Sequence, residues 1–110
     1  MERLFIYGTL APGRVNHGVM EDIPGKWEKA VVKGKLLNEG WGADSGYPGI
    51  IPSDDGDEVE GYIFSSEHLS KHWAMLDDFE GSGYKRVLVI AKAETGENVE
   101  SYVYALNKEA

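Results

Sequence analysis

The sequence predicts an α+β domain, built on a small, mainly antiparallel β-barrel or strongly curled sheet with one or two helices packed on it. About six segments have the alternating or β-branched pattern of strands, and short loops connect most of them. One further segment has helical spacing. The chain has 110 residues, 42% of them hydrophobic and 27% charged, which is the composition of a globular protein. We therefore expect a single domain spanning residues 1–110.

The first strand is predicted at residues 4–7, an apolar run that leads into the glycine- and proline-containing loop of residues 8–13. Asn16 is a candidate N-cap for a brief helix that follows this loop. The second strand is predicted over residues 27–37, and Gly34 in its middle indicates a bulge or a bend. These elements form the first third of the predicted domain.

The remaining strands follow residue 46. After a glycine-rich loop at residues 38–46, residues 47–52 are predicted as an edge strand, because each of its two prolines removes a ladder N–H. Residues 59–64 alternate in the manner of a strand with one more buried face. Residues 84–93 and 99–106 flank a Glu-Thr-Gly-Glu turn, so we expect a terminal hairpin.

The segment before this hairpin is the clearest helix. Ser65 and Ser66 are candidate N-caps, and Gly81 is placed to end the helix as a C-cap. Apolar residues between them recur at spacings of four and three, as on one face of a helix. These residues are Leu69, Trp73 and Leu76.

Glu80 is the next member of this apolar stripe, so a carboxylate occupies a position where the pattern requires an apolar side chain. Burial, the negative end of the helix dipole and the neighbouring Asp77 and Asp78 would all raise its pKa. A carboxyl with a raised pKa is suited to general acid–base catalysis. Alternatively, the helix frays and Glu80 points into water, or it pairs with Lys85 or Arg86.

Tyr7, Gly8, Thr9 and Leu10 form a second candidate site. A strand that ends at a glycine turn leaves backbone N–H groups without ladder partners, and such amides can bind a carboxylate or an oxyanion. The absence of a side chain on Gly8 would permit close approach. The alternative is an ordinary turn between a strand and a loop.

Composition excludes several classes of function. Eleven Lys and Arg against nineteen Asp and Glu give a net charge of -8, which weighs against nucleic acid and anionic membranes as partners. With no cysteine, the chain has no disulfide and no cysteine nucleophile. We expect a cytoplasmic protein, because the sequence has neither a signal peptide nor an apolar run of about 18 to 20 residues.

We expect no metal site. His68 and His72 are four residues apart, as a pair of metal ligands would be, but no third ligand is placed with them. His17, beside Asn16, is either a substrate contact or part of a local cap. No phosphate-binding loop, dinucleotide fingerprint or serine-hydrolase motif is present.

Short blocks in a fixed order cover the chain nearly from end to end. They lie at residues 5–10, 12–17, 47–49, 59–61, 76–81, 84–86 and 102–104. The pair formed by Tyr-Gly-Thr-Leu near the N-terminus and Leu-Asp-Asp-Phe-Glu-Gly some seventy residues later resembles the gamma-glutamylcyclotransferase-like family. The Pro-Gly-Arg-Val-Asn-His element is more similar to the gamma-glutamylamine cyclotransferase branch than to the larger glutathione-degrading enzymes.

The resemblance implies a compact mixed barrel with a pocket at one end. It also implies conversion of a small gamma-glutamyl compound to 5-oxoproline and a free amine or amino acid, without metal or cofactor. The family's catalytic carboxylate falls on Glu80, and its substrate-binding loop falls on Tyr7, Gly8, Thr9 and Leu10. We expect Tyr84 to line the pocket wall beside Tyr7.

Two other classes of function stay open. One is a non-catalytic small-molecule-binding module on the same scaffold; the other is a protein-interaction domain with Trp27 and Trp41 in an exposed patch. Glu80 favours the enzyme, because a protein that only binds an anionic ligand needs no carboxylate there. Arg86 either balances charge near the site or supports the sheet. The sequence identifies no protein partner.

Overall fold

The computed structural model describes residues 2–7, 12, 17–37, 49–81 and 83–106. Its elements, in chain order, are β1 (Glu2–Ile6), η1 (His17–Met20), β2 (Lys26–Leu37), β3 (Gly49–Pro52), β4 (Asp57–Ser66), η3 (Leu69–Lys71), α1 (Trp73–Glu80), β5 (Tyr84–Ala93) and β6 (Asn98–Leu106). The two η elements are 3-10 helices.

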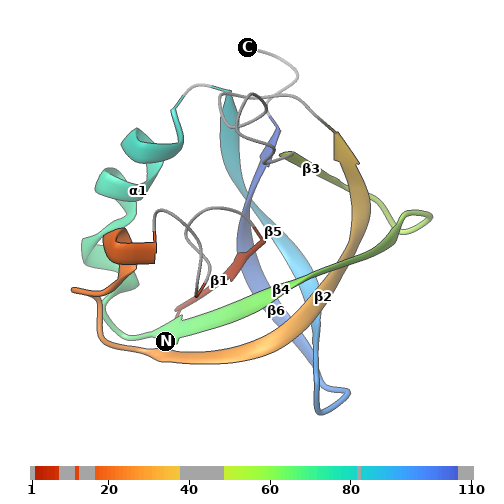
Figure 1. The fold of residues 1–110 in the computed structure, drawn as a ribbon, viewed down its shortest axis with the longest axis horizontal. Helices are drawn as coiled ribbons and strands as arrows, with labels where there is room; N and C mark the ends of the chain where they lie inside the picture. Colours follow the sequence, from red (N-terminus) through yellow and green to blue (C-terminus); the bar gives the residue numbers. More distant parts are fainter. Residues whose placement is uncertain (1, 8–11, 13–16, 38–48, 82, 107–110) are drawn as a thin grey trace.

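Five of the strands close a mixed barrel with one helix outside it, which confirms the predicted fold class. Around the ring, β1 pairs with β4, β4 with β2, β2 with β5, and β5 with β6, all antiparallel. The parallel pairing of β6 with β1 closes the ring. Figure 1 shows β2 curving around the barrel and α1 lying beside the strands.

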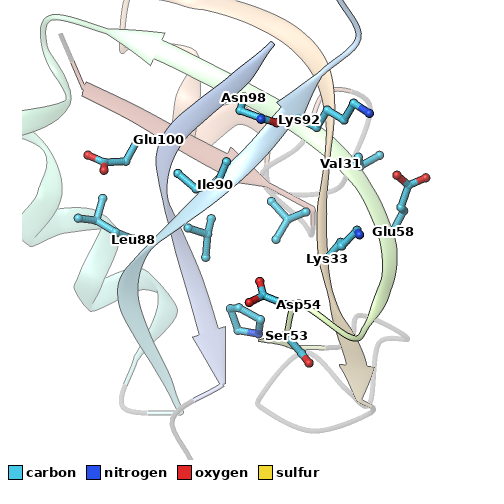
Figure 2. Close-up of a pocket in the computed structure, with 13 residues that line it drawn as sticks. Val31, Lys33, Ser53, Asp54, Glu58, Leu88, Ile90, Lys92, Asn98 and Glu100 are labelled. Carbon is cyan, nitrogen blue, oxygen red and sulfur yellow. The ribbon is translucent and has the colours of Figure 1, made fainter. Parts of the chain in front are cut away.

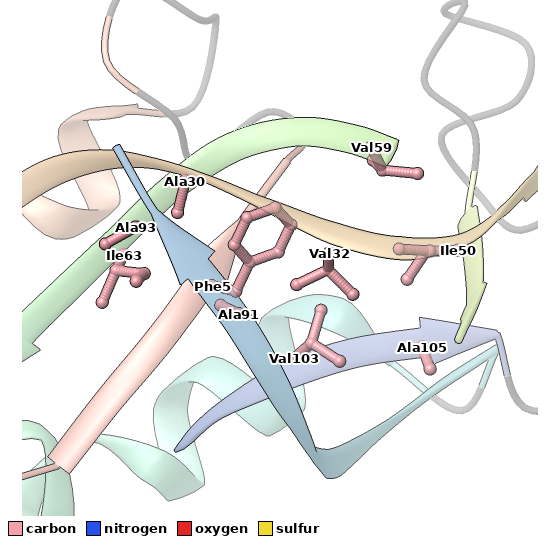
Figure 3. Close-up of a cluster of buried hydrophobic side chains, with 10 residues drawn as sticks. All are labelled: Phe5, Ala30, Val32, Ile50, Val59, Ile63, Ala91, Ala93, Val103 and Ala105. Carbon is pink, nitrogen blue, oxygen red and sulfur yellow. The ribbon is translucent and has the colours of Figure 1, made fainter. Parts of the chain in front are cut away.

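The interior of the barrel is filled by one of two hydrophobic clusters, which we call the barrel core. Its largest side chain is that of Phe5, which points into the space enclosed by the strands together with Val32 and Val103 (Figure 3). Several positions around them are alanines. Small residues suit the interior of a barrel of this size, because there is room for few large side chains.

The second cluster, the outer core, packs the helical segments against the outside of the barrel. Leu4 and Ile6 of β1 belong to it, whereas Phe5 between them belongs to the barrel core. Leu69 and Leu76 contribute to it from η3 and α1. The second half of β1 is therefore buried on both faces, which accounts for its apolar run from Leu4 to Ile6.

The helix differs from its prediction at the N-terminal end. Ser66 is the last residue of β4 and not an N-cap, and α1 begins at Trp73 with His72 as the N-cap residue. The Ser66 hydroxyl accepts the backbone N–H of His68 at 2.9 Å, which forms a turn of the type that serine also favours. At the other end, Gly81 is the C-cap with φ of 80°, as its position predicted.

Strand β3 is not at an edge, contrary to the sequence prediction. It pairs with β2 and also contacts β6 through the parallel pair Ile50↔Ala105. Pro52 is the last residue of the strand, and Ser53 next to it donates its N–H to Lys33 O at 3.0 Å. The missing N–H of Pro52 is therefore tolerated at the strand end. Residues 47 and 48 of the predicted strand lie outside the described residues.

The predicted terminal hairpin is confirmed as β5 and β6, and the brief helix predicted after Asn16 is observed as η1. Within the described ranges, no helix is both long and apolar enough to cross a membrane.

Candidate active site

Tyr7 directly follows β1 and is fixed at one end of the barrel. Its hydroxyl donates to the backbone oxygen of Tyr104 at 2.6 Å and accepts the N–H of Ile50 at 3.0 Å. Burial raises the pKa of Tyr7, and nearby Tyr84 and Glu80 raise it further, whereas the hydrogen bond from Ile50 lowers it. The phenol is therefore neutral at physiological pH and ties β1 to β3 and β6.

Glu80 is the last residue of α1 and lies on the inward side of the helix, one turn after the fully buried Leu76. Its side chain is half-buried and interacts electrostatically with the hydroxyls of Tyr7 and Tyr104. The structure thus brings Tyr7, Tyr84 and Glu80, which are far apart in the sequence, to one end of the barrel. Their common position agrees with the apolar stripe that predicted an inward-facing carboxylate.

Burial raises the pKa of Glu80 to about 7. A carboxyl with this pKa is nearly half protonated at neutral pH, so it can both accept and return a proton. The sequence also attributed part of the shift to Asp77 and Asp78. In the structure, burial is the cause of the raised pKa of Glu80. The Asp77 carboxylate interacts with Arg86 and Tyr104.

Asp77 forms an ion pair with Arg86, with 3.4 Å between Arg86 Nε and Asp77 Oδ1. The same oxygen accepts the hydroxyl of Tyr104 at 2.7 Å. Among the described residues, none forms an ion pair or hydrogen bond with the Glu80 carboxylate. The structure therefore rules out the alternative in which Glu80 pairs with Lys85 or Arg86.

Comparison with known proteins decides the family. The family described as "Gamma-glutamyl cyclotransferase, AIG2-like" matches residues 4–110. The chain belongs to this family. The resemblance found from the sequence blocks is thereby confirmed.

Relatives of this cyclotransferase family agree in sequence and in structure. A curated relative from Niallia circulans, named gamma-L-glutamyl-butirosin B gamma-glutamyl cyclotransferase, is 35% identical over 88 residues, which are 80% of this chain. The chain spans about half of that relative's length, 53%. The crystal structure of an AIG2-like protein from Mus musculus superimposes with a TM-score of 0.75 at 28% identity, over 100% of this chain and 80% of the mouse chain.

A third relative is the YkqA protein of Bacillus subtilis, whose crystal structure matches with a TM-score of 0.72 at 26% identity. The match covers 96% of this chain but 36% of YkqA. The cyclotransferase fold therefore also occurs as part of a longer chain.

Some residues that the sequence analysis singled out lie outside the described residues. These are Gly8, Thr9 and Leu10 of the predicted substrate-binding loop, as well as Asn16 and Trp41. His17, which the sequence left between substrate contact and local cap, begins η1, and its ring lies 5.2 Å from that of Trp27. Trp27 itself packs against the outer core, which argues against its role in an exposed patch.

Tyr104 is a residue of this candidate site that the sequence did not predict. It is buried in the outer core, it accepts a hydrogen bond from Tyr7 through its carbonyl, and its hydroxyl binds Asp77. The sequence carried no usable signal for this contact, because only the hairpin register seen in the structure places Tyr104 directly opposite Arg86.

Several hollows lie on the surface of the described part, and two of them bear on the candidate site. One, of about 460 Å³, lies against the C-terminal turn of α1 and includes Tyr84, Tyr104 and Gly81 in its lining. The other is a larger groove of about 900 Å³ where β2 and β5 separate beyond Val31. Figure 2 shows Leu88 and Ile90 on one side of this groove, and none of the described site residues lines it. Neither Glu80 nor Tyr7 lines either of these two hollows, so the hollows do not by themselves locate the candidate site.

Metal ligands are not grouped in the described part of the chain, where no three His, Asp or Glu side chains lie together as a metal would require. His68 and His72 flank η3 as its cap residues. The chemistry available at the described site is that of a carboxyl with a raised pKa among tyrosines.

Proposed function

We propose that the chain cyclises a small gamma-glutamyl compound to 5-oxoproline and releases a free amine or amino acid. The observation that carries this proposal is Glu80, whose half-buried carboxyl has a pKa of about 7 in a member of a cyclotransferase family. Proton transfer at neutral pH is most effective when the catalytic pKa is close to the ambient pH. This site meets that condition without a charged partner among its described neighbours.

In the proposed reaction, Glu80 accepts a proton from the α-ammonium group of the substrate. The freed amine then attacks the γ-carbonyl carbon, and a five-membered ring forms as the new C–N bond is made. Collapse of the tetrahedral intermediate breaks the bond to the leaving amine, to which Glu80 returns its proton. Glu80 then takes the second proton of the ring nitrogen and passes it to the released amine, which departs as its ammonium form. The atoms balance without a water molecule or a redox step, so the proposed chemistry requires no cofactor.

The loop of Gly8, Thr9 and Leu10 has a binding role in this proposal. Its backbone N–H groups hold the α-carboxylate of the substrate or the oxyanion of the intermediate. Such a contact fixes the folded substrate conformation in which amine and carbonyl are close, and this lowers the entropic barrier to ring closure. Tyr7 and Tyr84 form the adjacent wall. The support for this role is the family motif and the position of Tyr7 at the end of β1.

The competing hypothesis is a module that binds a gamma-glutamyl compound without converting it. Glu80 favours the enzyme over this module, because binding the anionic part of a ligand requires no carboxyl with a raised pKa. A carboxyl that exchanges protons near neutral pH does have a purpose in catalysis. We therefore favour the cyclotransferase.

The test is incubation with a panel of gamma-glutamyl amines and amino acids, with 5-oxoproline and free amine both quantified. Gamma-L-glutamyl-butirosin B belongs in the panel, because a relative of 35% identity is named for it. Glu80→Gln is expected to lower the rate by about 10²- to 10⁴-fold, since the amide cannot accept the proton. Glu67→Gln changes an exposed carboxylate of the neighbouring segment and serves as the control. Binding without product formation by the parent protein would favour the non-catalytic module.

A further inference from the structure

Polar contacts connect four elements at the C-terminal turn of α1. The Tyr7 hydroxyl donates to the carbonyl of Tyr104 on β6 at 2.6 Å, and the Tyr104 hydroxyl donates to Asp77 Oδ1 on α1 at 2.7 Å. Arg86 of β5 approaches the same Asp77 oxygen at 3.4 Å. Both strands of the terminal hairpin, β5 and β6, therefore hold the side chain of Asp77.

Arg86 is itself held in place by aromatic rings. Its guanidinium carbon lies 4.2 Å from the ring centroid of Trp73 and 5.3 Å from that of Tyr102. The indole N–H of Trp73 donates to Glu2 Oε2 at 2.9 Å. A planar guanidinium stacks on aromatic faces in a way that an ammonium does not, so these contacts are specific to arginine.

The helix that carries Glu80 depends on such contacts for its position. α1 has 8 residues, and a helix of this length is marginal in isolation, so tertiary contacts decide where it lies. Asp77 precedes Glu80 by three residues, and its backbone oxygen accepts the N–H of the C-cap residue Gly81 at 3.0 Å. Asp77 thus orders the same helical turn through both its side chain and its backbone.

We propose that Arg86, Asp77 and Tyr104 form a clamp that positions Glu80 for proton transfer. The inference rests on the proposed cyclotransferase function and assigns these three residues a positioning role. It also answers the question that the sequence left open for Arg86, which acts on the site through Asp77. None of the three residues need touch the substrate.

The clamp controls how much water reaches Glu80. Among the described residues of the barrel, Tyr7 and Tyr104 interact electrostatically with Glu80, and both phenols stay neutral near pH 7 because burial raises their pKa values. On its own helix, Asp77 is paired with Arg86, and Asp78 is exposed. If the clamp opens, the C-terminal turn of α1 gains freedom and water hydrates the carboxylate, so the pKa of Glu80 should fall.

The test uses two conservative variants, Tyr104→Phe, which removes one hydroxyl, and Arg86→Lys, which keeps the charge but not the planar stacking. We expect kcat to fall by about tenfold or more, because a displacement of about 1 Å can cost on the order of 100-fold in rate. KM should change by less than about threefold. In parallel, carboxyl NMR should show the pKa of Glu80 falling toward about 4.3, the ordinary value for glutamate.

Tyr62→Phe is the matched control, since it removes a hydroxyl from a half-buried tyrosine on β4 that packs against Trp27. It should change neither the Glu80 pKa nor kcat. A lower melting temperature for Tyr104→Phe and Arg86→Lys, with kcat and the Glu80 pKa both unchanged, would mean a merely structural role and would overturn the clamp. The NMR titration does not depend on activity. If the parent protein converts no compound in the panel, the proposed function fails, while the titration still decides whether the clamp exists.

Discussion

Arg86 forms its ion pair with Asp77, at 3.4 Å, and leaves Glu80, one helical turn further on, without an ion pair among the described residues. A cation beside Glu80 would lower the pKa of its carboxyl. Because the Arg86 guanidinium pairs with Asp77, it does not offset the effect of burial, which raises the pKa of Glu80 to about 7. The pairing of one carboxylate thus sets the chemistry available to the next.

Shortening the proposed catalytic side chain should impair the reaction even though a carboxylate is kept. In Glu80→Asp the carboxyl withdraws by one methylene group, and proton transfer requires hydrogen-bond contact with the substrate amine. We expect kcat to fall by about 10- to 100-fold with a smaller change in KM. Steady-state kinetics of 5-oxoproline release would measure this. A kcat equal to that of the parent would show that the position of this carboxylate is not critical.

The ionisation of Glu80 should also appear in the pH dependence of stability. Its pKa is about 7 in the folded protein and about 4.3 in the unfolded chain, so the folded state binds more protons between these values. Its contribution therefore lowers the free energy of unfolding as the pH rises from about 4.3 to 7. Glu80→Gln removes this effect.

Relative to the parent, Glu80→Gln should gain stability across that pH window, by on the order of 3 kcal/mol at most above pH 7. Urea unfolding at pH 4, 5.5 and 7.5 would measure the difference. Glu67→Gln, at an exposed site, should show no such trend. A constant difference between Glu80→Gln and the parent at all three pH values would contradict a raised pKa in the folded state.

The inward position of Glu80 could be predicted from the sequence, because it depends on the local periodicity of the helix. Leu69, Trp73 and Leu76 define one face, and the next position on that face must also point inward if the helix continues. The structure retains this face even though the segment divides into η3 and α1. A change of helix type between Leu69 and Trp73 did not alter which side of the chain is buried.

The contacts around Glu80 could not be predicted from the sequence, because they depend on strand register. The turn predicted at residues 94–97 is observed between β5 and β6, but the sequence does not show which residues pair across it, and in the structure Ala93 N donates to Glu97 O at 2.8 Å. Gly96, at φ of 94°, takes the left-handed position of this loop. A shift of one residue in register moves every side chain to the other face, so the opposition of Arg86 and Tyr104 could not be derived.

The pairings between strands far apart in the sequence could not be predicted either. The parallel pairing of β1 with β6 joins the two ends of the described chain and closes the barrel. The prediction of an edge strand at residues 47–52 was wrong because it relied on proline content. Pro52 lies at the end of β3, where its missing N–H does not prevent pairing on both sides.

Tyr7→Phe should destabilise the barrel end next to the site. The change leaves the carbonyl of Tyr104 and the N–H of Ile50 without their shared partner, and an unsatisfied buried group costs about 1–3 kcal/mol. Urea unfolding would measure the loss. Tyr102→Phe removes a hydroxyl that forms no hydrogen bond with a described residue and should cost less. Equal losses in the two variants would contradict the structural role of the Tyr7 hydroxyl.

Gly8→Val should weaken ligand binding, because a β-branched side chain would restrict the turn and obstruct approach to the backbone amides. We expect the affinity for 5-oxoproline to fall by about tenfold or more. Isothermal titration calorimetry would measure it, with Gly18→Ala as control, since a Cβ at Gly18 meets no atom within 4 Å. Unchanged affinity in a folded Gly8→Val protein would remove this loop from the proposed site.

If Glu80 transfers the proton in cyclisation, its pKa should agree with the pH dependence of the reaction, and two measurements test this. The pKa of Glu80 in the free protein is measured by carboxyl NMR, with Glu80→Gln to assign the signal. It is then compared with the acid limb of kcat/KM for 5-oxoproline formation, which reports the free enzyme. Both values are expected to lie near 7 and to coincide. A Glu80 signal titrating near 4.3, or an acid limb that does not follow the measured pKa, would contradict it.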